Sequence, residues 1–182
     1  MGRPTEDLVN EHKVIMRMLE IIKKASDRLE KGEEVSPELF VQATDFFKNF
    51  ADRCHHTKEE KHLFVELMAH GLSGEVGPIA VMMREHQDGR GHVKKLDALS
   101  SSKMTPRTKK SLIKTSRAYV DLLSKHIQKE NNILFPMADQ MLTPEDQDRL
   151  ERAFEDVETK VMGPGVHEKY HGLIENWERR YG

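Results

Sequence analysis

The sequence predicts an all-α protein, an antiparallel up-down four-helix bundle with a C-terminal helical extension. Three observations lead to this fold class. Apolar residues recur at spacings of three, four and seven, as they do on one face of a helix. Capping residues followed by proline open the helical stretches, and short loops separate them. No stretch alternates apolar and polar residues as a strand does.

Each predicted helix has its own start or stop signals. Thr5 is the expected cap of the first helix, and Lys31-Gly32 stops it. Serine or threonine followed by proline opens three of the later helices, and Pro78 opens another. The predicted helices are residues 5–31, 36–70, 78–99, 105–136, 143–161 and 167–182. Long helices joined by short loops pack antiparallel. We therefore divide the chain into residues 1–142, the bundle, and residues 143–182, a helical appendage packed on it.

Composition excludes several classes of partner. Charged residues make up 33% of the chain, but the formal net charge is only −2, so no basic field attracts nucleic acid or anionic lipid. No apolar run approaches the ~20 residues that span a bilayer, and the first residues lack the apolar core of a secretory signal. The single cysteine, Cys54, excludes an intramolecular disulfide framework. We expect a cytoplasmic protein without nucleic-acid or membrane partners, with a homodimer as its candidate assembly.

A duplicated motif carries the functional signal. The stretch HHTKEEKHLF (residues 55–64) recurs as HIQKENNILF (residues 126–135), and both read His-x-x-x-Glu followed by Leu-Phe. Aligning the Leu-Phe pairs matches His55 with His126 and Glu59 with Glu130. An i,i+4 spacing places each His and Glu on one helix face. A single His-x-x-x-Glu is weak, but the repeat selects these pairs from several in the chain.

The repeat extends upstream to a Glu-His pair in each half. His12 precedes the first motif histidine by 43 residues, and His86 precedes the second by 40. At 1.5 Å per residue, all six groups fall at one level of an antiparallel bundle. Buried His and Glu are costly unless they are paired or bind a metal. Imidazole and carboxylate ligands without thiolate favour two iron ions, bridged by the glutamates and by an oxo or hydroxo group.

Four motifs together resemble those of the hemerythrin-like, or HHE cation-binding, family, over roughly residues 5–140. They are EH (11–12), HHTKEEKHLF, REHQDGR (84–90) and HIQKENNILFP. The resemblance implies a four-helix bundle whose non-heme di-iron centre binds or reacts with O2, NO or peroxide. The metal ligands it implies are His12, His55, Glu59, His86, His126 and Glu130. Oxygen carriers of the family place a second histidine four residues after the ligand of the third helix, where this chain has Arg90. This favours sensing, reactive-species chemistry or iron handling over O2 transport.

Several neighbours of the motif keep alternative interpretations. His56 and Glu60 are expected to face outward, and they form the competing ligand register. Tyr119 either lines the ligand pocket, where it binds the small molecule, or is a core aromatic residue. His62 and Glu66 are expected at the end of the bundle. The alternative functions are an iron- or oxygen-dependent sensor or interaction module without turnover, and an iron-storage or iron–sulfur-repair protein. Whether the protein is an enzyme stays open.

Overall fold

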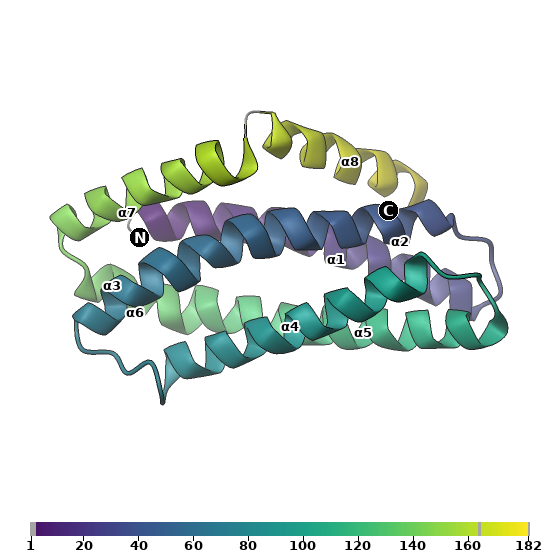
Figure 1. Cartoon of the computed structure of the whole chain (residues 1–182), viewed down its shortest axis with the longest axis horizontal. Helices are drawn as coiled ribbons and strands as arrows, with labels where there is room; N and C mark the ends of the chain where they lie inside the picture. The colour runs from purple at the N-terminus through teal and green to yellow at the C-terminus, as the bar shows by residue number, and fades with distance from the viewer. Residues whose placement is uncertain (1–2, 164, 182) are drawn as a thin grey trace.

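The computed structural model describes residues 3–163 and 165–181, and every regular element among them is a helix. Figure 1 shows long helical stretches lying side by side, with the chain reversing direction at each loop between them. The all-α fold class predicted from the apolar spacing is therefore confirmed for these residues. Within the same ranges, no helix combines the length and apolar character needed to cross a bilayer.

The first half of the chain forms two helical stretches. The first is a single helix, α1 (Arg3–Glu30). The second is made of consecutive segments: α2 (Pro37–Phe46), η1 (Phe47–His56), η2 (Glu59–Leu63) and α3 (Phe64–Ala69). The η segments are π-helices, in which each backbone hydrogen bond spans five residues instead of four. Short π-helical turns inside α-helices are frequent at functional sites.

The second half of the chain repeats this plan. Helix α4 (Pro78–Ser100) is followed by a stretch made of α5 (Pro106–Lys129), the π-helix η3 (Glu130–Leu134) and α6 (Phe135–Met141). Helix α5 packs against both α4 and α1, and α2 packs against α4. Both η2 and η3 span five residues and begin at the glutamate of the repeated motif. The sequence repeat is therefore also a repeat of backbone conformation.

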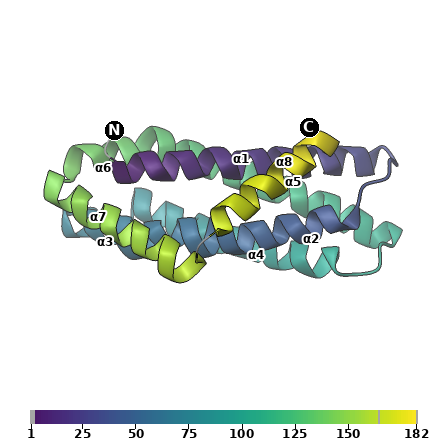
Figure 2. The ribbon, with the colours of Figure 1, turned by 90° about the horizontal axis from the view of Figure 1, so that it is seen from above.

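The C-terminal residues pack on the outside of these stretches. Helix α7 (Pro144–Asp156) continues as the π-helix η4 (Val157–Met162), and α8 (Val166–Tyr181) follows. Figures 1 and 2 show α7 and α8 lying across α1 and the second stretch, and both helices contact α1. Tyr170, Ile174, Trp177 and Tyr181 of α8 join the same apolar cluster as residues of α1 and α2. We call α7, η4 and α8 the appendage.

One predicted helix start was wrong, and another lacks the expected hydrogen bond. Helix α1 begins before Thr5, so Thr5 lies inside the helix and does not cap it, and its buried hydroxyl donates to Asp139 Oδ1 at 2.6 Å. Ser36 does occupy the capping position of α2, but its side chain makes no capping hydrogen bond. Its backbone N–H instead donates to the Tyr181 hydroxyl at 3.0 Å. The predicted stop after α1 is confirmed, because Gly32 adopts φ +85°, which a glycine takes without strain.

The apolar core is divided into two clusters. One contains residues such as Leu19, Phe47 and Leu123. The other contains Leu8, Leu63 and Leu134, among others. On each of the four helical stretches, the histidines and glutamates singled out by the sequence lie where the residues of one cluster give way to those of the other. The candidate site is therefore a polar layer enclosed by apolar packing on both sides.

Candidate metal centre

Seven buried side chains converge in this polar layer. They form two groups, each able to place one ligand atom per residue within 4.8 Å of the others. Every member is at most 4% exposed. The first group is His12, His55, Glu59 and Glu130; the second is His56, His86, His126 and Glu59. The structure thus brings together all six residues that the sequence singled out, and adds His56.

In the first group, two imidazoles face each other and each meets a glutamate. His12 Nε2 lies 2.8 Å from His55 Nε2. The Glu130 carboxylate approaches His12 Nε2 at 3.3 Å, and that of Glu59 approaches His55 Nε2 at 3.5 Å. These Nε2 and carboxylate oxygen atoms surround a common point between α1, η1, η2 and η3.

The second group has the same core and one additional ring. His86 Nε2 lies 3.1 Å from His126 Nε2. The other oxygen of Glu59 lies 3.3 Å from His86 Nε2, and Glu130 Oε2 lies 3.1 Å from His126 Nε2. The His56 ring stacks on that of His86, with centroids 3.9 Å apart. Each glutamate therefore contacts at least one histidine of each group, and Glu130 also reaches His86 Nε2 at 3.9 Å. Both carboxylates lie between the two groups of histidines.

An oxygen acceptor orients every one of the five imidazoles. Each Nδ1 lies within 3.2 Å of a carboxylate or amide oxygen. The pairs are His12 with Asn131, His55 with Glu11, His56 with Asp52, His86 with Glu60, and His126 with Glu85. In a neutral ring this places the proton on Nδ1 and leaves the lone pair of Nε2 directed at the centre. Metal-binding histidines are held in this way.

Cationic side chains hold these acceptors in turn. Lys58 Nζ donates to Glu11 at 2.7 Å, and Lys129 Nζ donates to Glu85. Arg90 donates to both Asp52 and Glu60 at 2.8 Å. Arg90, at the position where the family's oxygen carriers have a histidine, thus supports the acceptors of His56 and His86 rather than joining the ligands.

The glutamates supply the test of whether a metal fits. All four carboxylate oxygens of Glu59 and Glu130 are buried, and none has a hydrogen-bond partner in the part of the chain that the structure describes. A buried carboxylate without a partner is strongly disfavoured. A cation between the imidazoles and the carboxylates would provide that partner for all four oxygens. Nitrogen and oxygen donors without thiolate suit a borderline divalent metal such as iron.

The electrostatics of the metal-free site follow from this crowding. Burial lowers the pKa of His86, but Glu59, Glu60 and Glu130 outweigh it and raise the pKa to about 10. Burial opposes the ionisation of Glu11, yet His55 and Lys58 lower its pKa to about 2. Burial and neighbouring cationic groups hold the pKa of His56 well below its ordinary value. His56 is therefore neutral, whereas His86 carries a proton that a metal must displace.

The comparison with known protein families agrees with this site. Residues 3–138 match the sequence profile of the Hemerythrin HHE cation binding domain. The chain belongs to the hemerythrin HHE cation-binding family. The resemblance predicted from the four motifs is therefore confirmed. All seven converging side chains lie within the residues that match the family.

Individual hemerythrin-family relatives are more distant. An uncharacterised protein of Mycobacterium bovis is 24% identical over 180 residues, which cover 97% of this chain and 69% of the relative. An iron-sulfur cluster repair protein, YtfE of Escherichia coli, is 31% identical over 133 residues, covering 60% of each chain. A protein of the same name from Enterobacter is 30% identical over the same length. The chain thus spans about three fifths of these repair proteins. No solved structure matches the chain.

The outward orientation predicted for His56 and Glu60 was wrong. His56 is 4% exposed and its ring stacks on His86, while Glu60 accepts the Nδ1 proton of His86. The prediction assumed an α-helical period, but the π-helical turns η1 and η2 hold more residues per turn. Adjacent side chains are then separated by a smaller angle, and both His55 and His56 can face the centre.

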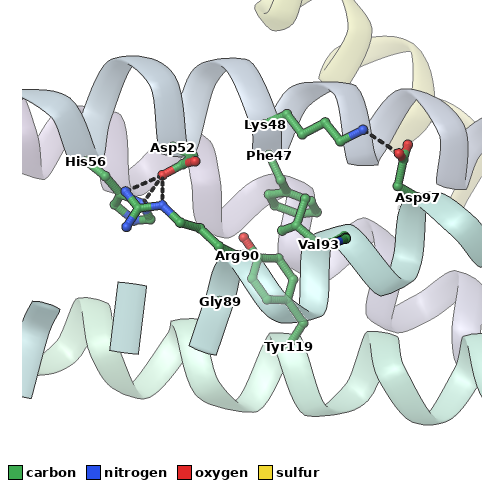
Figure 3. A pocket seen from close by; sticks show the side chains of 10 residues that line it. Phe47, Lys48, Asp52, His56, Gly89, Arg90, Val93, Asp97 and Tyr119 are labelled. Atoms are coloured by element: carbon green, nitrogen blue, oxygen red, sulfur yellow. Dashed lines mark hydrogen bonds and ion pairs between the residues drawn. The ribbon is translucent and has the colours of Figure 1, made fainter. Parts of the chain in front are cut away.

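Tyr119 lies beside the centre and in the core. It is 2% exposed and lines a cavity of about 190 Å³ together with Phe47, His56 and Arg90. Figure 3 shows its ring reaching from α5 into this cavity below Phe47, with Arg90 and His56 on one side. Tyr119 is therefore a core aromatic residue that also lines a cavity beside His56. That it binds a small molecule there stays a prediction.

His62 and Glu66 have partners of their own. The His62 ring lies 6.4 Å from that of Phe154, and Glu66 accepts a hydrogen bond from Arg149 at 2.8 Å. Both partners belong to α7, so these two side chains bind the appendage.

Proposed function

We propose that this protein is a non-heme di-iron protein that binds or reacts with O2, NO or peroxide. His12 and His55 would hold one iron, and His56, His86 and His126 the other, with Glu59 and Glu130 bridging them. The observation that carries the proposal is the set of four buried carboxylate oxygens that have no hydrogen-bond partner in the described residues and face five oriented imidazoles. Two irons would supply the redox chemistry that these small molecules require.

The unequal number of histidines supports a small-molecule ligand. One metal position has two imidazoles and the other has three. Glu59 belongs to both groups of ligands, and Glu130 of the first group also lies 3.1 Å from His126 Nε2 of the second. Iron commonly takes more ligands than the first position offers, so that position would keep room for an exogenous molecule. The five oriented rings and the apolar clusters on both sides keep this position fixed and shielded from bulk water.

The cavity beside His56 is our proposed route for that molecule. Its volume of about 190 Å³ is several times the roughly 30 Å³ that one water molecule occupies in the liquid. O2, NO or peroxide would therefore pass, and Tyr119 would offer its hydroxyl to a molecule held there. The cavity borders the histidine-rich position, and the other position lies behind it across the shared glutamates.

We also propose the finer arrangement that the sequence predicted. Residues 1–142 would form an antiparallel up-down four-helix bundle, and residues 143–182 would pack on it. The contacts of α5 with α1 and α4, and of α2 with α4, support this arrangement. A cytoplasmic location and a homodimer stay predictions.

A repair function for iron–sulfur clusters is the second candidate. It is favoured by the relatives named iron-sulfur cluster repair protein YtfE. Such a protein would share the metal centre but would deliver or restore iron in another protein. Restoration of a damaged iron–sulfur enzyme by the iron-loaded protein, without peroxide turnover, would favour repair. Turnover without restoration would favour chemistry on the small molecule itself.

Metal analysis tests the leading proposal. Protein purified anaerobically with iron should contain about two irons per chain, one for each group of ligands. His56→Ala and His126→Ala should each lower that content, because each removes an imidazole from the centre. His171→Ala is the matched control, since this histidine lies in α8 and outside both groups of ligands. Optical spectra before and after O2, NO and peroxide would then identify the ligand. An iron content near zero in the wild-type protein, with the same content in His126→Ala, would refute the proposal.

A further inference from the structure

Lys58 joins the appendage to the metal centre. Its side chain is fully buried, and Nζ donates to Glu158 of η4 at 2.5 Å and to Glu11 of α1 at 2.7 Å. The ammonium also stands 5.6 Å from the centre of the Phe154 ring of α7. Two of these three partners belong to the appendage. Since a buried ammonium needs such partners, the appendage determines where this cation lies.

From Lys58 the contacts continue to a metal-facing imidazole. Glu11 is 6% exposed and uses its two oxygens differently: Oε1 accepts from Lys58 at 2.7 Å and Oε2 from His55 Nδ1 at 2.8 Å. A carboxylate held at both oxygens has a fixed orientation, and it passes that orientation to the ring. One continuous series of charged hydrogen bonds therefore runs from Glu158 through Lys58 and Glu11 to His55. We call it the appendage relay.

The second half of the chain contains the same series without an appendage. His126 Nδ1 lies 3.0 Å from Glu85, and Lys129 donates to the other oxygen of Glu85. Lys58 and Lys129 hold equivalent positions in the repeat, three residues after His55 and His126. Yet the Lys129 side chain is 35% exposed, whereas that of Lys58 is 0% exposed. The two lysines are therefore equivalent in the repeat, but only Lys58 is buried, because the appendage covers it.

We propose that the appendage is part of the metal centre: Glu158 and Phe154 hold Lys58 against Glu11 and so fix His55 at the His12–His55 metal position. The inference deepens the proposed function and rests on it for the identity of the metal. Lys58 and Glu158 are positioning residues, because they act through Glu11 and touch no ligand atom at Nε2. A displacement of η4 would change the orientation of His55 at one metal position and leave the other position unchanged. The appendage would thus control metal binding at one position only.

Iron binding by the full-length protein tests the appendage relay. Glu158→Gln should weaken one of the two binding steps by roughly tenfold, the lower end of the effect seen when the partner of a ligating histidine is lost. Lys58→Met should do at least the same. The glutamate is partly exposed, so its variant keeps the test valid if Lys58→Met fails to fold. Lys129→Met is the matched control, and it should leave the step affected by Glu158→Gln unchanged.

Double variants identify which metal position responds. Combined with His12→Ala, Glu158→Gln should have little further effect, because the position it supports is already lost. Combined with His56→Ala, its effect should persist in full. In the iron-loaded protein, Mössbauer spectra of ⁵⁷Fe should show one altered signal and one unaltered signal. Equal loss at both positions, or no change at either, would overturn the proposal.

A metal-free measurement separates this inference from the proposed function. In protein without metal, the imidazole ¹⁵N resonances of His55 should shift in Glu158→Gln, while those of His126 should not. This readout holds whether or not the wild-type protein binds iron. Failure to bind iron would refute the di-iron proposal alone, whereas an unchanged His55 resonance would refute the appendage relay.

Discussion

At the scale of single residues, the neighbours of the ligands in sequence support ligands on other helices. Glu11 precedes His12 but accepts the proton of His55, and Glu85 precedes His86 but accepts that of His126. The residues after Glu59 and Glu130 act across the halves: Glu60 accepts from His86 and Asn131 from His12. In each Glu-His pair of the sequence, the glutamate therefore orients a histidine on another helix, and the histidine that follows it faces the centre.

Glu60 and Asn131 are equivalent in the repeat but differ in charge. A carboxylate stands behind His86, and a neutral amide stands behind His12. Since an anionic partner raises the basicity of a ligating imidazole, the two metal positions would differ in electronic character. This difference adds to the one created by His56, which has no counterpart histidine in the second half, where the aligned residue is Ile127.

Metal binding should depend on pH through His86. Its pKa of about 10 means that the metal-free ring is protonated at all lower pH values. Since Nε2 must lose its proton to bind a metal, loading at neutral pH should release at least about one proton per chain. Affinity should therefore rise with pH up to about pH 10 and fall as the solution is acidified. Calorimetric titration with Fe2+ in buffers of different ionisation enthalpy counts these protons.

Glu60→Gln is the informative comparison for this pH effect. It removes one of the charges that raise the pKa of His86, so fewer protons should be released at neutral pH. His171→Ala, in α8 and outside both groups of ligands, should release the same number as the wild-type protein. If loading released no proton from the wild-type protein, the protonated state assigned to His86 would be wrong.

At the scale of elements, the π-helical turns decide which residues reach the centre. Both η2 and η3 begin at a glutamate of the centre, and η1 ends at His56. The additional residue in each turn brings adjacent side chains to the same face, so a ligand and its neighbour can both serve the site. The helix starts, in contrast, follow local rules, because proline opens α2, α4, α5 and α7 as the sequence predicted.

The start of α7 offers a test of local capping. The Thr143 hydroxyl accepts from the Asp146 backbone N–H at 3.2 Å, and Asp146 accepts from the backbone N–H of Thr143 at 2.8 Å. Loss of such a cap typically costs about 1 kcal/mol. Thr143→Ala should therefore lower the free energy of unfolding by about that amount in urea denaturation. Thr159→Ala is the matched control, and an exposed site of this kind should change stability by less than about 0.5 kcal/mol. Equal effects of the two substitutions would argue against the capping role.

At the scale of the whole molecule, the metal centre separates two apolar clusters, and the appendage extends both of them. Phe154 of α7 joins one cluster, and Trp177 of α8 joins the other. Trp177 is 1% exposed and donates to Gln42 of α2 at 2.9 Å. Arg17 of α1 also makes a double hydrogen bond to Glu178 of α8. The apolar contacts indicate that α8 folds together with the first two stretches, and the tryptophan seals that contact.

Removal of the tryptophan should therefore destabilise more than the appendage. Trp177→Ala should lower the free energy of unfolding by about 3–5 kcal/mol, as for other buried large aromatic residues. Since the chain has one tryptophan, far-UV circular dichroism should follow the unfolding. Ile133→Ala, at a side chain 52% exposed, should change stability by less than about 0.5 kcal/mol. A comparable small loss for Trp177→Ala would show that α8 is an independent attachment.

The sequence by itself determined the helical class, most helix starts and the six repeated residues that meet in the centre. These follow from local rules: apolar periodicity, capping residues and proline, and a duplication visible by alignment. Even the level at which the groups meet follows from the constant rise of a helix.

Only the tertiary structure decided the seventh member, the acceptors behind the histidines and the role of Lys58. His56 turns inward because of π-helical turns, which an assumed period of 3.6 residues does not contain. Apart from Asp52, which lies four residues before His56, the acceptors and the appendage contact join residues 26 to 119 positions apart. Such pairs leave no periodic signal along the chain, since they form only when separate helices pack and exclude water from their charges.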